Sequence, residues 1–307
     1  MDNSKYEERI NLLKKVEQYE REGRFDEDTN IDPPAPTLEP DDIDYLREKI
    51  TSKWVKTPVA MFLGELYFKS SARKKQVMIK DVFGLENLEN LTTGGIITSN
   101  HFNPFEAFAV EKVFLESKMS KKHKLYAVIR EGNYTNFPGL YGFLLKNCNT
   151  LPLSSNHQTM RKFYNAVETL LNRGEFVLIY PEQSMWWNYQ KPKPLKDGAY
   201  RFACRHNVPI IPFFITTKES DILDDIGFPI LEYFVHIGKP IYKDENLTDK
   251  ENIQNMKKEN FLVWKKVYEA FYHLPLEYTC DKSKLPDYVL EALENKDSEN
   301  GTKNYLL

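Results

Sequence analysis

The sequence predicts an α/β fold with a mixed central sheet flanked by helices and with an added N-terminal helical segment. Short runs rich in β-branched and aromatic residues alternate with helical stretches between residues 77 and 237, and this alternation is typical of a sheet covered by helices. The chain has 307 residues, of which 41% are hydrophobic and 28% are charged. The composition is ordinary for a soluble globular protein, and the length favours one large domain with appendages.

Residues 1–40 are expected to form a charged helix followed by a linker. The helical pattern covers Lys5 to Arg24. The stretch after it, from Asp26 to Asp42, is rich in proline and acidic residues, and we expect it to bury little. The charged N-terminus has no apolar stretch of the kind found in a signal peptide.

Residues 41–76 are expected to be helical, and their apolar positions allow two interpretations. The helices pack on the main domain, or one of them lies in a membrane interface with its basic end, Arg73 to Lys75, toward anionic headgroups. The longest apolar run, Thr57 to Phe68, is shorter than the roughly 20 residues of a membrane span and contains Glu65. A lipid-handling protein of this sequence is therefore expected to be peripheral to the membrane.

The expected main domain covers residues 41–275, and its residues 77–240 carry the strand and helix alternation. Strands are expected at residues 77–82, 95–99, 125–129, 150–153, 176–180, 210–216 and 233–237. Helices are expected at residues 105–117, 159–173, 199–206 and 249–273. Residues 276–307 are expected to form a C-terminal tail.

Charge, cysteines and absent motifs exclude several functional classes. The net charge of −3 indicates no nucleic-acid partner. The three cysteines, Cys148, Cys204 and Cys280, form no paired motif and favour a reducing, cytoplasmic environment. The sequence contains no Gly-x-Ser-x-Gly elbow, P-loop or His-Glu-x-x-His motif, and its histidines have no metal-ligand spacing. We therefore expect no metal.

His101 and Glu106 are separated by four residues where a buried strand gives way to a helix. In open α/β sheets, ligands bind at the carboxyl ends of strands, where His101 is expected. Glu106 can hold one imidazole nitrogen so that the other accepts a proton from a hydroxyl. Alternatively, Glu106 completes a capping box with Asn103, and His101 is an incidental loop residue.

Four sequence blocks, in order, resemble those of the glycerolipid acyltransferases, the lysophospholipid and glycerol-phosphate acyltransferases with a His-x4-Asp motif. The similarity covers roughly residues 77–240. The blocks are Asn100-His101-x-x-x-x-Glu106, Phe137 to Ser155, Tyr180-Pro-Glu-Gln-Ser184, and Lys196-Asp-Gly-Ala199 followed by Val208-Pro-Ile-Ile-Pro212.

The resemblance implies an acyltransferase-like fold and a role in phospholipid synthesis. An acyl group would pass from acyl-CoA or an acyl carrier protein to a hydroxyl of a lysophospholipid or glycerol-phosphate acceptor at a membrane surface. His101 would be the general base, Glu106 would orient it, and no cofactor would be bound. The residues expected to bind substrate are Asn103, Glu182, Gln183, Ser184 and Arg130.

The sequence departs from the family pattern at three positions, and these departures leave alternatives open. Glu106 replaces the usual aspartate, while Ser155 and Met185 occupy positions where the family commonly has arginines. Because guanidinium groups are favoured for phosphate recognition, the acceptor is alternatively a lipid or glycolipid without a free phosphate. A catalytically inactive member that only binds lipid or acyl carrier is a further alternative.

Two other features each have a structural and a functional interpretation. The aromatic cluster Met185 to Tyr189 either belongs to the core or lies where an acyl chain meets headgroups. The basic clusters at residues 121–124 and 191–196 are either solvated faces or attract an acidic carrier protein, coenzyme A phosphates or an anionic membrane.

Overall fold

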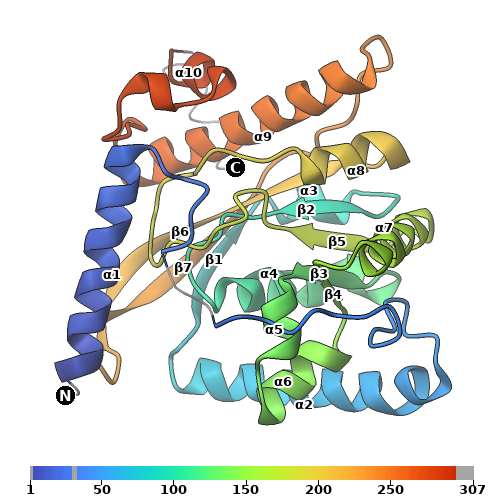
Figure 1. The fold of residues 1–307 in the computed structure, drawn as a ribbon. Helices are drawn as coiled ribbons and strands as arrows, with labels where there is room; N and C mark the ends of the chain where they lie inside the picture. The colour runs from blue at the N-terminus through green and yellow to red at the C-terminus, as the bar shows by residue number, and fades with distance from the viewer. Residues whose placement is uncertain (1–2, 30–32, 295–307) are drawn as a thin grey trace.

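The computed structural model describes residues 3–29 and 33–294 and contains a seven-stranded mixed sheet (Figure 1). The strand order is β1-β7-β6-β2-β5-β3-β4. Only β6 and β7 pair antiparallel, and the other neighbours are parallel. The strands are β1 (Met78–Phe83), β2 (Gly95–Thr98), β3 (Leu125–Ile129), β4 (Thr150–Pro152), β5 (Phe176–Ile179), β6 (Ile210–Leu223) and β7 (Pro229–Ile237). The predicted fold class is confirmed.

Helices cover both faces of the sheet, because the central strands bury residues on both sides. Successive residues of a strand point to opposite faces. Accordingly Ile96 packs with α7, α8 and α9, whereas Ile97 packs with α4. Figure 1 shows α8 and α9 on one side of the sheet and α2 on the other. The α-helices are α1 (Asn3–Glu22), α2 (Thr57–Arg73), α3 (Leu85–Glu89), α4 (Glu106–Glu116), α5 (Glu131–Thr135), α6 (Gly139–Asn147), α7 (His157–Asn172), α8 (Gly198–His206), α9 (Asp249–Tyr272) and α10 (Asp287–Glu294).

Local signals explain where α7 and α9 begin. Asn156 precedes α7, and its side chain accepts hydrogen bonds from the backbone N–H groups of Gln158 and Thr159. At α9, Thr248 and Glu251 form a complete capping box. These polar residues satisfy N–H groups that the first helical turn leaves without partners.

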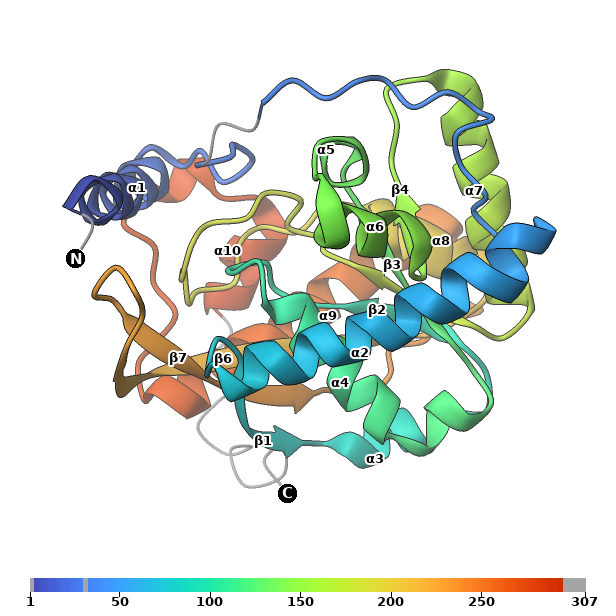
Figure 2. The same ribbon diagram turned by 90° about the horizontal axis from the view of Figure 1, so that it is seen from below.

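The segment between α1 and residue 50 runs along the main domain. As expected, most of the described residues of the predicted linker, Asp26 to Asp42, are exposed, but Leu38 and the residues just after the linker anchor it. Leu38, Ile43 and Tyr45 are each at most 5% exposed. The Leu38 carbonyl accepts hydrogen bonds from Ser154 Oγ at 3.0 Å and Thr159 Oγ1 at 2.8 Å. Figure 2 shows the segment crossing the molecule from α1 toward α7. The prolines keep it extended, and its apolar residues reach α7 and β4. Part of the predicted linker, residues 30–32, lies outside the described residues.

Two further boundaries differ from the sequence expectation. Residues 41–49 are turns rather than helix, and the helical region begins at about residue 50 with a π-helical turn, Ser52–Lys56, before α2. Arg47 has a positive φ of 57°, and its guanidinium ties the turn to the Cys148 carbonyl. The described part of the expected tail packs on α9, where Val289 is fully buried. Residues 295–307 lie outside the described residues.

Candidate active site

His101 lies just beyond the carboxyl end of β2 at the centre of the sheet. Strands β2, β5 and β3 are neighbours and parallel, so the residues that follow them meet at one edge. Glu182 follows β5, and Arg130 follows β3. The sheet topology therefore brings residues from three distant parts of the sequence to the same rim.

Glu106 is the first residue of α4 and bonds the His101 imidazole. Glu106 Oε1 lies 2.5 Å from His101 Nδ1. Its other oxygen accepts hydrogen bonds from the backbone N–H groups of Phe102, at 3.2 Å, and of Asn103. Glu106 is 1% exposed, while the His101 side chain is 23% exposed. A carboxylate on Nδ1 favours the tautomer in which Nε2 has a free lone pair for an incoming proton.

The ring of Tyr180 stacks on the imidazole ring of His101. Its centroid lies 4.4 Å from that of the His101 ring, with 24° between the planes. The Tyr180 hydroxyl is buried and makes no hydrogen bond, and burial raises its pKa well above the ordinary value. Tyr180 belongs to the third block, but no role was predicted for it from the sequence. Its position at the end of β5, next to Glu182, was the available signal.

Glu182 fixes the backbone at His101 instead of facing solvent. Glu182 Oε2 accepts a hydrogen bond from the His101 N–H at 2.9 Å, and Oε1 accepts one from the Lys193 N–H at 2.8 Å. Glu182 is 2% exposed and Lys193 is 1% exposed. Burial raises the pKa of Glu182 and lowers that of Lys193, while attraction between the two charges opposes both shifts. The Lys193 ammonium bonds Ser184 in the interior. Neither interpretation of the basic cluster at residues 191–196, as a solvated face or as an attractor of acidic partners, predicted a buried lysine.

The other residues predicted to bind substrate lie around His101 and Glu106, and they differ in exposure and in hydrogen-bond partners. Asn103 Nδ2 donates to Asn188 Oδ1 at 3.1 Å. Gln183 is exposed, and its carbonyl accepts a hydrogen bond from Arg130 Nη2 at 3.1 Å. Ser184 is 1% exposed, and its hydroxyl donates to the Phe25 carbonyl at 2.9 Å. Its hydroxyl thus bonds the segment after α1.

Comparison with known proteins identifies the segment that holds these residues. Residues 81–216 match the family model described as Acyltransferase. We call residues 81–216 the acyltransferase-like segment. The resemblance inferred from the four sequence blocks is therefore confirmed. The matched segment contains His101, Glu106, Arg130 and Glu182.

One solved structure similar to the chain is that of the 1-acyl-sn-glycerophosphate (LPA) acyltransferase PlsC from Thermotoga maritima. The match has 18% sequence identity and a TM-score of 0.42, and it covers 68% of this chain and 80% of that chain. The comparison with curated proteins finds no match.

The aromatic cluster of the acyltransferase-like segment packs in the core beneath the segment after α1. Trp186 is fully buried, stacks on Phe25 with centroids 5.5 Å apart, and donates from Nε1 to the Glu27 carbonyl at 2.8 Å. The guanidinium of Arg9 lies 3.7 Å from the ring centroid of Trp187. These contacts favour the core interpretation over an acyl-chain contact.

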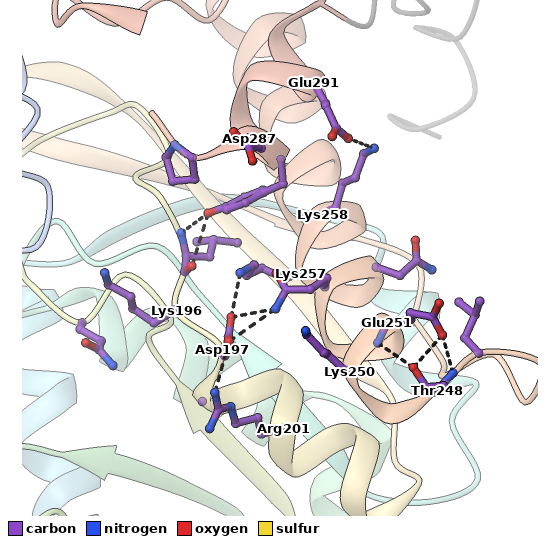
Figure 3. A pocket seen from close by; sticks show the side chains of 18 of the residues that line it. Lys196, Asp197, Arg201, Thr248, Lys250, Glu251, Lys257, Lys258, Asp287 and Glu291 are labelled. Atoms are coloured by element: carbon purple, nitrogen blue, oxygen red, sulfur yellow. Dashed lines mark hydrogen bonds and ion pairs between the residues drawn. The ribbon is translucent and has the colours of Figure 1, made fainter. Parts of the chain in front are cut away.

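A cavity of about 1310 Å³ lies between α8, α9 and α10 (Figure 3). Several of its charged residues form ion pairs with one another. Lys257 Nζ lies 2.7 Å from Asp197 Oδ1, and Lys258 pairs with Glu291. Gln183 of the third block and Lys196 of the fourth block also line the cavity. Within residues 3–29 and 33–294, no group of three or more His, Cys, Asp or Glu side chains is arranged to hold a metal ion.

Proposed function

We propose that the protein transfers a fatty acyl group from a thioester donor to a hydroxyl of a lipid acceptor, with His101 as general base. The contact of 2.5 Å between His101 Nδ1 and Glu106 Oε1 carries this proposal. It orients a partly exposed imidazole at the strand edge where α/β sheets bind ligands. The donor is an acyl-CoA or an acyl carrier protein, and no bound cofactor takes part.

In the proposed reaction, the acceptor oxygen attacks the thioester carbonyl while His101 Nε2 takes the hydroxyl proton. The C–O bond forms, and the carbonyl electrons move to an oxyanion. When the oxyanion collapses, the C–S bond breaks, and the thiol leaves with the proton from the imidazolium. Glu106 stabilises that imidazolium, and Glu182 holds the His101 backbone in place. Because a thioester is already activated, the reaction needs no acyl-enzyme intermediate.

The acceptor we propose first is a lysophospholipid or glycerol-phosphate, with a role in phospholipid synthesis. A lipid or glycolipid without a phosphate monoester is the second candidate. Ser155 and Met185 favour it, since both occupy positions where the resembling family commonly has arginines. Ser155 Oγ instead shares a hydrogen bond of 3.2 Å with Thr37 Oγ1.

We propose further that α2 and the turn before it dock the enzyme on an anionic membrane. Ile50, Trp54 and Phe62 are 80%, 71% and 61% exposed. With Val59 and Leu66 they recur every three to five residues, which gives one apolar face. Exposed basic residues flank this face, at Lys53 and Lys56 and at residues 73–75. An apolar stripe with basic flanks matches the chemistry of an anionic bilayer surface.

We assign this surface to the cytoplasmic side as a peripheral association. The free thiols of Cys148, Cys204 and Cys280 support a reducing environment. Across the described ranges, 3–29 and 33–294, none of the helices is both long and apolar enough to traverse a bilayer.

Turnover by the purified protein on vesicles tests the proposed function. Mass spectrometry would follow acyl-CoA and acyl carrier donors against paired lysolipids that differ only in the phosphate. We expect an acylated product that His101→Ala abolishes, and the reacting acceptor decides between the two candidates. Lipid binding without product from any pair would instead support a catalytically inactive, lipid-binding member.

A further inference from the structure

The chain presents four consecutive exposed apolar residues where α6 begins. We call this stretch, Phe-Pro-Gly-Leu at residues 137–140, the α6 tip. Phe137 is 42% exposed and Leu140 is 49% exposed. Gly139 has a positive φ of 65°, and a side chain added there would meet no neighbouring atom. The α6 tip thus projects outward, and an exposed apolar surface of this kind often marks a binding site.

The backbone at the start of α6 fixes this exposure. The Gly142 N–H donates to the Pro138 carbonyl at 3.3 Å. A Cβ atom at Gly142 would collide with the carbonyl oxygen of Phe137, so only glycine lets the chain turn so closely onto the helix. The outward position of Phe137 is therefore built into the fold.

The α6 tip lies beside the exposed apolar face of α2. The ring centroid of Phe137 is 5.1 Å from that of Tyr141, which is 6.1 Å from that of Tyr67 on α2. Leu66, the neighbour of Tyr67, belongs to the apolar face and is 47% exposed. Figure 1 shows α2 and α6 together at the bottom of the molecule, and Figure 2 shows them from below. The tip therefore continues the apolar face of α2 onto a second element.

The same aromatic rings connect the α6 tip to the candidate active site. The ring of Tyr67 lies 6.0 Å from that of Phe108, which lies 6.3 Å from that of Phe105, the residue before Glu106. Burial raises the pKa of Tyr141, and the neighbouring Tyr67 and Glu106 add to this shift. A surface that touches the tip is therefore close to the carboxylate that orients His101.

Exposed cations border the combined apolar surface of α2 and the α6 tip. Residues 73–75, at the end of α2, are basic and exposed, and they follow Tyr67 by about two helical turns. Lys146, on α6, is also exposed. The charge of Glu65 is balanced by Lys69, whose ammonium lies 2.6 Å away. An apolar surface with such a border matches the interface of an anionic bilayer.

We propose that the α6 tip is a second membrane-contact site, which enters the interface of an anionic bilayer beside α2 and holds the rim of the His101 site against the lipid. The proposal rests on the proposed function, because it extends the membrane docking assigned to α2. The insertion is shallow, since the first turn of α6 leaves backbone N–H groups that hydrocarbon cannot satisfy.

Vesicle binding by the full chain tests this proposal. Vesicles of phosphatidylcholine and phosphatidylglycerol in equal parts would be sedimented with wild type and with the double variant Phe137→Ser, Leu140→Ser. We expect the affinity of the double variant to fall on the order of tenfold, because two apolar side chains no longer leave water. The exchange variant Phe137→Leu, Leu140→Phe keeps the tip apolar and should bind as wild type does. Both variants should keep the wild-type melting temperature.

A control variant and a measurement on the wild type accompany this comparison. Tyr242→Ser with Leu274→Ser removes two side chains that are 60% and 58% exposed, and this variant should keep the wild-type affinity. Their neighbours Ile241 and Leu276 pack in the cluster on the α9 side of the sheet. In wild type, hydrogen exchange at residues 139–141 should slow when the vesicles are added.

Wild-type affinity in Phe137→Ser, Leu140→Ser would overturn the proposal, as would an equal loss in the control variant or unchanged exchange at residues 139–141. If only the α2 variant Trp54→Ser, Phe62→Ser lost affinity, docking through α2 would stand and the tip proposal would fail. Absence of vesicle binding by wild type would overturn both. No acyl donor is present in these measurements, so they are independent of the turnover assay of the proposed function.

Discussion

Glu106 bonds the His101 imidazole through one carboxylate oxygen and two backbone N–H groups of the following loop through the other. The capping box that the sequence suggested as an alternative is not formed, because α4 begins at Glu106 itself and the Asn103 side chain accepts its hydrogen bond from the Phe105 N–H. The backbone bonds fix the carboxylate, and the fixed carboxylate orients the ring. Glutamate reaches both sets of partners because its side chain starts from the first residue of α4, at the end of the loop.

Replacing Glu106 with glutamine should separate the effect of the negative charge of Glu106 from the effect of its size and hydrogen bonds. Glu106→Gln keeps the size of the side chain but loses the charge that stabilises an imidazolium. We expect kcat to fall by about 10²-fold or more, with little change in KM. Glu106→Asp, with a shorter side chain, should retain part of the activity. Steady-state kinetics and the melting temperature of each variant check this, and a fully active Glu106→Gln protein would contradict the role of the charge.

The buried pair of Glu182 and Lys193 should be coupled energetically. Lys193→Met leaves the Glu182 carboxylate buried without its cation, and we expect this to cost about 3 kcal/mol of unfolding free energy. In the double variant with Glu182→Gln, the loss should be smaller than the sum of the two single losses by about 1 kcal/mol or more. Urea unfolding of the four proteins measures this coupling. Additive losses would mean that the two charges do not interact.

The apolar face of α2 should bind anionic vesicles. Trp54→Ser combined with Phe62→Ser removes two of its most exposed side chains, and we expect vesicle affinity to fall about tenfold or more. Leu274→Ser is the matched control, because Leu274 is 58% exposed and follows α9 on the other side of the sheet. Vesicle sedimentation measures the affinities. Equal losses in both proteins would argue against α2 as the docking surface.

Stability should fall in acid because of His236. Burial lowers the pKa of His236 to about 4, whereas a histidine in an unfolded chain titrates near about 6.5. The unfolded state therefore binds a proton that the folded state excludes. Stability present above pH 6.5 is lost as the pH falls toward 4, by up to about 3 kcal/mol.

Chemical unfolding at pH values between about 6.5 and 4 checks whether His236 causes this loss of stability. His236→Gln should remove most of the loss that depends on this group and keep a donor or acceptor for Thr216, which lies 2.9 Å from Nε2. His157→Gln changes an exposed histidine and serves as the control. If the pH dependence in His236→Gln matched that of wild type, another group would be responsible.

The sequence predicted those elements whose signals are local. The strand at Leu125–Ile129 matches the prediction, and the start of α9 at Asp249 coincides with its capping box. The outer part of β6, from Thr217 to Leu223, was missed because its first five residues are polar. Backbone pairing with β7 forms it instead, as far as the Leu223–Pro229 pair.

The candidate site was predicted where one motif contained both partners, and missed where partners were distant in sequence. His101 and Glu106 are five positions apart, so their contact could be anticipated. Asp28 and Arg130 form an ion pair although they are 102 positions apart, and no local pattern links them. The stacking of Tyr180 on His101 also depends on β2 and β5 being neighbours, which spacing within either motif does not indicate.

The most direct test of the account is the rate of acyl transfer in His101→Ala against a matched histidine variant. With the reacting donor and acceptor on anionic vesicles, we predict that His101→Ala lowers the initial rate by about 10³-fold. His157→Ala should retain the wild-type rate, and both variants should bind vesicles as wild type does. An unchanged rate in His101→Ala would contradict the central claim that this imidazole accepts the acceptor's proton.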